Sequence, residues 1–136
     1  MTTTLENSAK LALVVEDDDT VSEHITKLLE ARGFKVAQEF DGMAALQRCR
    51  SEKFNLVVCD IRLPRLSGIS FLRNLRQAEA NAGQNTVALS VIMMSSLSDN
   101  AAKREILAAG TPHFLVKPVS GAALDAMLTI LNMNSV

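Results

Sequence analysis

The chain has 136 residues, of which 48% are hydrophobic and 21% are charged, and its formal net charge is −1. A chain of this length and composition suits one compact domain with a substantial core and leaves no room for a second domain. The weak net charge excludes the basic surface of a direct nucleic-acid-binding protein, and the lack of a long apolar run excludes a membrane-spanning segment.

Residues 1–10 are polar, and we expect them to form a flexible N-terminal tail. This segment has neither the basic nor the apolar region of a signal peptide, so a cytoplasmic protein is expected. From residue 11 onward, strand-like apolar runs alternate with helix-like patterns, and the folded domain is expected to cover residues 11–134. The five predicted strands cover residues 11–15, 35–40, 55–59, 90–94 and 113–116.

A helix is predicted after each strand, from apolar residues at helical spacing and from capping residues or glycine at the ends. The first helix is expected to be capped by Asp19 or Thr20 and to stop at Gly33. The second helix is predicted to cover residues 42–50, and the third to start near Ser67 and to break at 80–85. The fourth is predicted to start at Asp99 or Asn100 and to end at Gly110, and the fifth to start near Ser120.

The apolar residues of these helices are expected to face the sheet. They are Val21, Ile25, Leu28, Leu29, Met43, Leu46, Cys49, Ile69, Leu72, Leu75, Ala102, Ile106, Leu107, Leu124, Leu128 and Leu131. Five strands separated by helices, with no internal repeat and no low-complexity stretch, predict the α/β fold class with a doubly wound parallel sheet.

Residues that can perform chemistry follow four of the five strands. They are Glu16, Asp17 and Asp18 after the first strand, Asp60 after the third, Ser95 and Ser96 after the fourth, and Lys117 after the fifth. Parallel sheets of this kind bind ligands at the carboxyl edge of the strands. Neighbouring carboxylates repel one another unless protons or a divalent ion offset their charge, and oxygen ligands suit Mg²⁺ better than Zn²⁺. Together with a hydroxyl and an ammonium group, they suit phosphoryl transfer.

Four segments of the chain resemble the receiver domains of two-component response regulators, including the chemotaxis regulators. They are residues 13–18, 60–68, 91–96 and 114–118, and the resemblance covers residues 11–131. It implies a flavodoxin-like (βα)5 fold with five strands in the order 2-1-3-4-5. It also implies a phosphoacceptor domain that takes a phosphoryl group from a sensor histidine kinase or a histidine phosphotransfer protein.

The resemblance assigns the acceptor and the metal ligands. It implies that Asp60 accepts the phosphoryl group and that Asp17 and Asp60 bind Mg²⁺ directly. Glu16 is implied to act on the ion through a water molecule. The backbone carbonyl of Arg62 is implied to supply a further metal ligand.

Three further positions complete the implied switch. Ser95 is implied to bind a phosphoryl oxygen, and Lys117 is implied to pair with the phosphoryl group. The bond between Lys117 and Pro118 is expected to be cis. Phe114 lies where the family keeps an aromatic residue that rotates inward on activation, and a fixed core aromatic is the alternative interpretation.

The implied function is that of a switch rather than a turnover enzyme, with self-phosphorylation and slow dephosphorylation as its only reactions. Phosphorylation is expected to change the surface formed by the fourth helix, the fifth strand and the fifth helix. The expected occupants of that surface are an unknown downstream protein, an output domain or a second copy in a homodimer. Because Arg62 and Leu97 are poor water-orienting groups at positions that control dephosphorylation in the family, a long-lived phosphorylated state is hypothesised.

Two alternatives compete with this interpretation. Residues 17–21 fit the nucleophile loop of haloacid-dehalogenase-type Mg²⁺ phosphatases, with Asp17 as nucleophile and Asp19 as general acid. The chain is short for that fold, however, and Asp60 would have no role in it. The second alternative is a degenerate receiver that acts only as a scaffold, against which the complete set of site residues argues. The sequence leaves open whether the chain is a stand-alone receiver or part of a longer regulator.

Overall fold

The computed structural model describes residues 10–83, 86–97 and 99–133. Strands and helices alternate along them. They are β1 (Lys10–Val15), α2 (Asp19–Glu30), β2 (Phe34–Glu39), α3 (Gly42–Ser51), β3 (Leu56–Asp60), α4 (Gly68–Ala82), β4 (Ser90–Ser95), α5 (Asn100–Ala109), β5 (Phe114–Val116) and α6 (Gly121–Ile130). Each strand end lies within one residue of its prediction. Of the predicted tail, residues 1–9 lie outside the described residues, and Lys10 belongs to β1.

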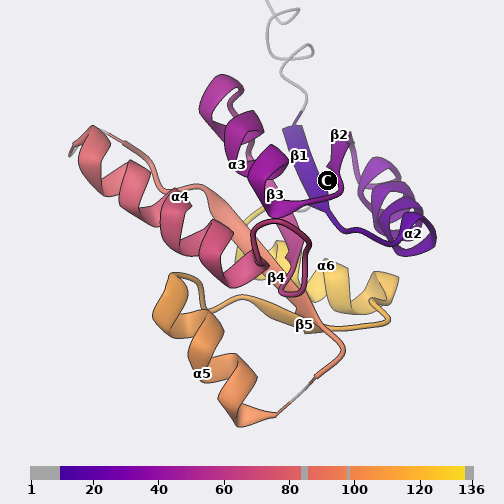
Figure 1. Cartoon of the computed structure of the whole chain (residues 1–136). Helices are drawn as coiled ribbons and strands as arrows, with labels where there is room; N and C mark the ends of the chain where they lie inside the picture. The colour runs from indigo at the N-terminus through magenta and orange to yellow at the C-terminus, as the bar shows by residue number, and fades with distance from the viewer. Residues whose placement is uncertain (1–9, 84–85, 98, 134–136) are drawn as a thin grey trace, which may run out of the picture.

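The strands form one sheet in the order β2-β1-β3-β4-β5, and every neighbouring pair is parallel. This confirms the predicted doubly wound sheet and its strand order. The residues of β3 are buried on both sides of the sheet, which explains why its sequence is an almost continuous apolar run rather than an alternating one. Figure 1 shows the sheet with helices on both faces.

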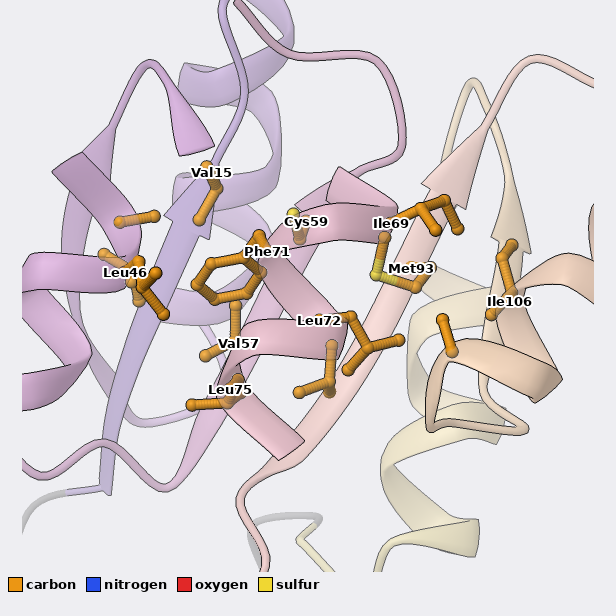
Figure 2. Close-up of a cluster of buried hydrophobic side chains, with 14 residues drawn as sticks. Val15, Leu46, Val57, Cys59, Ile69, Phe71, Leu72, Leu75, Met93 and Ile106 are labelled. Carbon is orange, nitrogen blue, oxygen red and sulfur yellow. The ribbon is translucent and has the colours of Figure 1, made fainter. Parts of the chain in front are cut away.

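Two hydrophobic clusters hold the helices against the two faces of the sheet. Helices α2 and α6 pack on one face, where Ile25, Leu29, Leu124 and Leu128 are at most 1% exposed. Helices α3, α4 and α5 cover the opposite face, where Phe71 of α4 is fully buried (Figure 2). The strand ends between these layers are therefore fixed by a core on each side.

The helix ends agree with the predictions except at the start of the first helix. The prediction that Asp19 or Thr20 caps the first helix is wrong: Asp18 caps α2, and its side chain accepts hydrogen bonds from the backbone N–H groups of Thr20 and Val21. The predicted break at 80–85 is confirmed: α4 ends at Ala82 and is capped by Gly83, whose φ of 102° favours glycine. Residues 84–85 lie outside the described residues.

Leu107 was expected to face the sheet but does not do so. Leu107 is 60% exposed, whereas its neighbour Ile106 is 1% exposed. Successive residues on a helix are about 100° apart, so α5 can present only one of the two to the core. Among the described residues, no helix is long and apolar enough to cross a membrane.

This contrast gives a matched pair of variants on α5. Ile106→Ala should lower the free energy of unfolding by about 2–5 kcal/mol, because it leaves a cavity in the core. Leu107→Ala should change it by less than about 0.5 kcal/mol, because it removes an exposed side chain. Urea denaturation of both variants measures the difference, and equal losses would contradict the packing of α5.

Candidate functional site

The sequence-predicted site residues come together at the carboxyl edge of the sheet. Glu16 and Asp17 directly follow β1, and Asp60 is the last residue of the adjacent β3. In the next strand, Met94 pairs with Asp60, so Ser95 lies one residue beyond this pair. Lys117 follows β5, the neighbour of β4. Parallel pairing therefore brings residues up to 101 positions apart to one edge.

Three carboxylates form an acidic cluster at this edge. One oxygen each from Glu16, Asp17 and Asp60 lies within 4.8 Å of the others. Glu16 and Asp60 are 1% and 6% exposed, while Asp17 is exposed to solvent. The cluster therefore has a buried floor and one accessible side, and its oxygen atoms are ligands that suit a hard divalent cation.

Lys117 bridges the two buried carboxylates. Its Nζ atom lies 2.7 Å from Asp60 Oδ2 and 2.9 Å from Glu16 Oε1. Burial alone would lower the pKa of Lys117, but the hydrogen bonds to Asp60 and Glu16 outweigh this effect and raise it. One ammonium group thus offsets much of the charge of two carboxylates.

The surroundings of Glu16 change its protonation. Burial raises the pKa of Glu16 to about 7, and the negative charge of Asp60 adds to the rise, while the hydrogen bond from Lys117 opposes it. Its second oxygen, Oε2, accepts a hydrogen bond of 3.2 Å from the backbone N–H of Asp18. The position of Glu16 is therefore fixed through both of its carboxylate oxygens.

The other Asp60 oxygen is held by the loop that follows β3. Asp60 Oδ1 accepts a hydrogen bond of 3.0 Å from the backbone N–H of Arg62. The loop returns to the strand at Gly68, whose N–H donates to the Ile61 carbonyl over 3.0 Å. A Cβ atom at Gly68 would lie only 2.0 Å from the Asp60 carbonyl oxygen, so this close approach requires glycine.

Ser95 and Lys117 are joined through the backbone. The N–H of Lys117 donates to the Ser95 carbonyl over 2.8 Å, and the following bond to Pro118 is cis, which confirms that prediction. Ser95 is 2% exposed, and its Oγ atom accepts a hydrogen bond of 2.9 Å from the Leu97 N–H. No hydrogen bond joins Ser95 Oγ to the three carboxylates in the described part of the chain.

Phe114 lies apart from the acidic cluster. It is the first residue of β5, is half-buried, and packs against the core cluster beneath α3, α4 and α5. Sequence reasoning missed two features of the site: the bridge from Lys117 to Glu16 and the close approach at Gly68. The glycine was visible as the end of the 60–68 segment, whereas no sequence signal specifies the bridge.

A family model for the response regulator receiver domain matches residues 12–129 of this chain. The chain is 34% identical over 116 residues to the transcriptional regulatory protein CseB of Streptomyces coelicolor. This match covers 85% of this chain and 46% of CseB. The chain therefore spans less than half the length of this curated relative.

Two solved structures have the same fold. The receiver domain of the Francisella response regulator 1452 is 31% identical, covers 90% of this chain and 95% of its own, and has a TM-score of 0.78. The second is the receiver domain of the sensor histidine kinase PA1611 of Pseudomonas aeruginosa, which has a magnesium ion coordinated in its active-site cleft. It is 26% identical to this chain, the match covers 90% of this chain and 97% of the PA1611 receiver, and the TM-score is 0.77.

The haloacid-dehalogenase alternative has no support from these similarities. It would leave Asp60 without a role, whereas Asp60 lies in the acidic cluster and is bound by Lys117. The family match over most of the chain, the strand order and the acidic cluster agree with one another. The chain belongs to the response regulator receiver domains of two-component signal transduction.

Proposed function

We propose that this chain is a phosphoacceptor switch in which Asp60 takes a phosphoryl group from the phosphohistidine of a sensor histidine kinase or a histidine phosphotransfer protein. The observation that carries the proposal is the position of Asp60. It ends the central strand β3, and its carboxylate lies within the acidic cluster and contacts Lys117. A carboxylate oxygen of Asp60 forms the new P–O bond while the P–N bond of phosphohistidine breaks and its electron pair returns to the imidazole.

The side chains around Asp60 have distinct parts in this transfer. Lys117 stabilises the negative charge on the Asp60 carboxylate and, after transfer, pairs with a phosphoryl oxygen. The Ser95 hydroxyl donates a hydrogen bond to another phosphoryl oxygen. Self-phosphorylation and slow dephosphorylation are the only reactions that we propose for the chain, and we propose that it acts in the cytoplasm.

The acidic cluster fits the Mg²⁺ expected from the sequence. Asp17 and Asp60 would bind the ion directly, Glu16 would act through water, and the Arg62 carbonyl would supply a further oxygen. The magnesium in the cleft of the PA1611 receiver supports this proposal. The bound ion would neutralise charge on the phosphoryl oxygens during transfer.

The proposed output is a change in the surface formed by α5, β5 and α6. Phosphorylation replaces the single charge of the Asp60 carboxylate with a phosphoryl group that carries roughly 1.5 to 2 negative charges and new acceptor oxygens, which attracts Ser95 and Lys117 and displaces the loops that precede α5 and α6. The surface has a groove of about 420 Å³ whose lining includes Leu107, Phe114 and Val116. We propose that Phe114 moves in this change, and that a downstream protein, an output domain or a second copy of the chain binds there.

Substitution of the acceptor tests the proposal. With acetyl phosphate and Mg²⁺, the wild-type chain should gain one phosphoryl group by intact-mass spectrometry, and Asp60→Asn should gain none. Asp99→Asn is the matched control, because asparagine retains the capping role that Asp99 has in α5. Phosphorylation of Asp60→Asn at the wild-type rate would contradict the proposal.

The lifetime of the phosphorylated state depends on the groups that orient the attacking water. Arg62→Asn and Leu97→Glu should each shorten this lifetime several-fold, because an amide or a carboxylate can position water next to the acyl phosphate. A phosphate-release time course measures it, with Arg104→Asn as a control on the exposed surface of α5. An unchanged lifetime in both variants would refute the assigned role of these positions.

The raised pKa of Glu16 predicts the pH dependence of stability without divalent ions. Between pH 4.5 and about 7, the unfolded chain releases the Glu16 proton while the folded chain keeps it. The contribution of Glu16 to the free energy of unfolding is therefore largest below pH 4.5 and is lost as the pH rises to about 7. Glu16→Gln should remove this loss in urea titrations with EDTA, and Glu105→Gln on the exposed surface of α5 should not. An unchanged pH profile for Glu16→Gln would disprove the burial effect.

A further inference from the structure

A second groove lies between α4 and α5, beside the loops that follow β3 and β4. Its volume is about 710 Å³, and none of Glu16, Asp17, Asp60 and Lys117 lines it. Figure 1 shows the two helices on the same side of the sheet. The groove is also separate from the one on the α5, β5 and α6 surface, since the two have no lining residue in common. The function proposed above uses two residues of its lining, Arg62 and Leu97, but assigns no occupant to the groove itself.

The two sides of the groove carry opposite charges. Arg73 lies on the α4 side, with Arg62 in the loop that precedes this helix, and Glu105 lies on the α5 side. All three side chains are exposed, and none forms an ion pair with another described residue. Asp99 also lines the groove, but its carboxylate is engaged in capping α5. The groove therefore offers positive charge on one side and negative charge on the other.

The surface between these charges includes several apolar side chains. Ile69 of α4 and Ala102 of α5 are 8% and 7% exposed, and Leu97 is 42% exposed. Ala101 and Ala102 have side chains too short to fill the space between the helices. Two neighbouring helices with small residues between them form a channel into which the side chains of a third helix can pack.

We propose that the α4–α5 groove binds an amphipathic helix of a partner protein, with an apolar stripe between an acidic edge and a basic edge. The apolar stripe packs on Leu97 and Ala101. The acidic edge pairs with Arg73 and Arg62, and the basic edge pairs with Glu105. Charge complementarity thus selects a partner helix that carries both signs of charge, one on each edge.

Occupancy of the groove is coupled to phosphorylation, and this part of the inference rests on the proposed function. Ile61 and Arg62 directly follow the acceptor Asp60, and both line the groove. On the other side, Ser95 Oγ accepts the hydrogen bond from the Leu97 N–H, so displacement of Ser95 toward a phosphoryl group pulls on Leu97. Each event therefore changes the affinity for the other by the same factor.

Three synthetic, alanine-based helical peptides with the same leucine stripe test the groove. One peptide has an acidic and a basic edge, one has two acidic edges, and one has two basic edges. In titrations of the full chain followed by ¹H–¹⁵N NMR, the peptide with one acidic and one basic edge (the two-signed peptide) should change the amide chemical shifts of α4, α5 and Leu97. It should bind roughly tenfold more tightly than either single-signed peptide, as expected for two exposed ion pairs.

Charge reversal of the chain should change the preferred peptide. Glu105→Arg should favour the acidic peptide, and Arg73→Glu should favour the basic one. Arg104→Glu is the matched control, because Arg104 is exposed on α5 but does not line the groove, and it should retain the wild-type preference. Equal binding of all peptides, or shifts confined to the α5, β5 and α6 surface, would overturn the inference. Concentration-dependent shifts of α4 and α5 without peptide would instead identify a second copy as the occupant and overturn it as well.

Beryllofluoride and Mg²⁺, which mimic the phosphorylated state, distinguish the two proposals. A changed affinity for the two-signed peptide, absent in Asp60→Ala, would support the coupling. Peptide binding without a beryllofluoride adduct would overturn the proposed function and leave the groove supported. An adduct with an unchanged peptide affinity would overturn the coupling alone.

Discussion

The repulsion between two buried carboxylates at one sheet edge is the constraint on which the site depends. Glu16 and Asp60 end up together because β1 and β3 are parallel neighbours in a sheet covered on both faces. Lys117, from the far end of the sheet, offsets their charge at 2.7 and 2.9 Å. The sheet order, the loop after β5 and the close approach at Gly68 all serve to hold these charged groups in place.

The same constraint makes the site responsive to phosphorylation. A phosphoryl group at Asp60 changes the negative charge that Lys117 must balance, and it offers new acceptor oxygens to Ser95 and Lys117. Inverting a 1:99 population requires about 5.5 kcal/mol of differential stabilisation, which several charge-assisted hydrogen bonds can supply. Ser95 Oγ accepts a hydrogen bond from the Leu97 N–H, and Arg62 lies in the loop that follows Asp60, so the groups displaced on phosphorylation border the α4–α5 groove.

The sequence predicts much of this architecture because local patterns and covalent order specify it. The apolar run before Asp60 and the glycine and capping residues between elements mark the strands and helices. The resemblance to receiver domains supplies the strand order, which the run of elements alone leaves open. Leu107 was misassigned because it and its neighbour Ile106 are both apolar, although the 100° step of a helix lets only one of them face the core. The α2 cap was misassigned because adjacent aspartates can each act as an N-cap. The bridge between Lys117 and Glu16 spans 101 residues, and only the folded sheet specifies it.

The most direct test of the account is chemical mapping of the phosphorylated residue. Borohydride reduces an aspartyl phosphate to homoserine, and tandem mass spectrometry of the digested chain then locates the modified position. The account predicts homoserine at position 60 alone after treatment with a phosphodonor and Mg²⁺. Homoserine at position 17, or at neither position in a chain shown to be phosphorylated, would contradict the assignment of Asp60 as the acceptor.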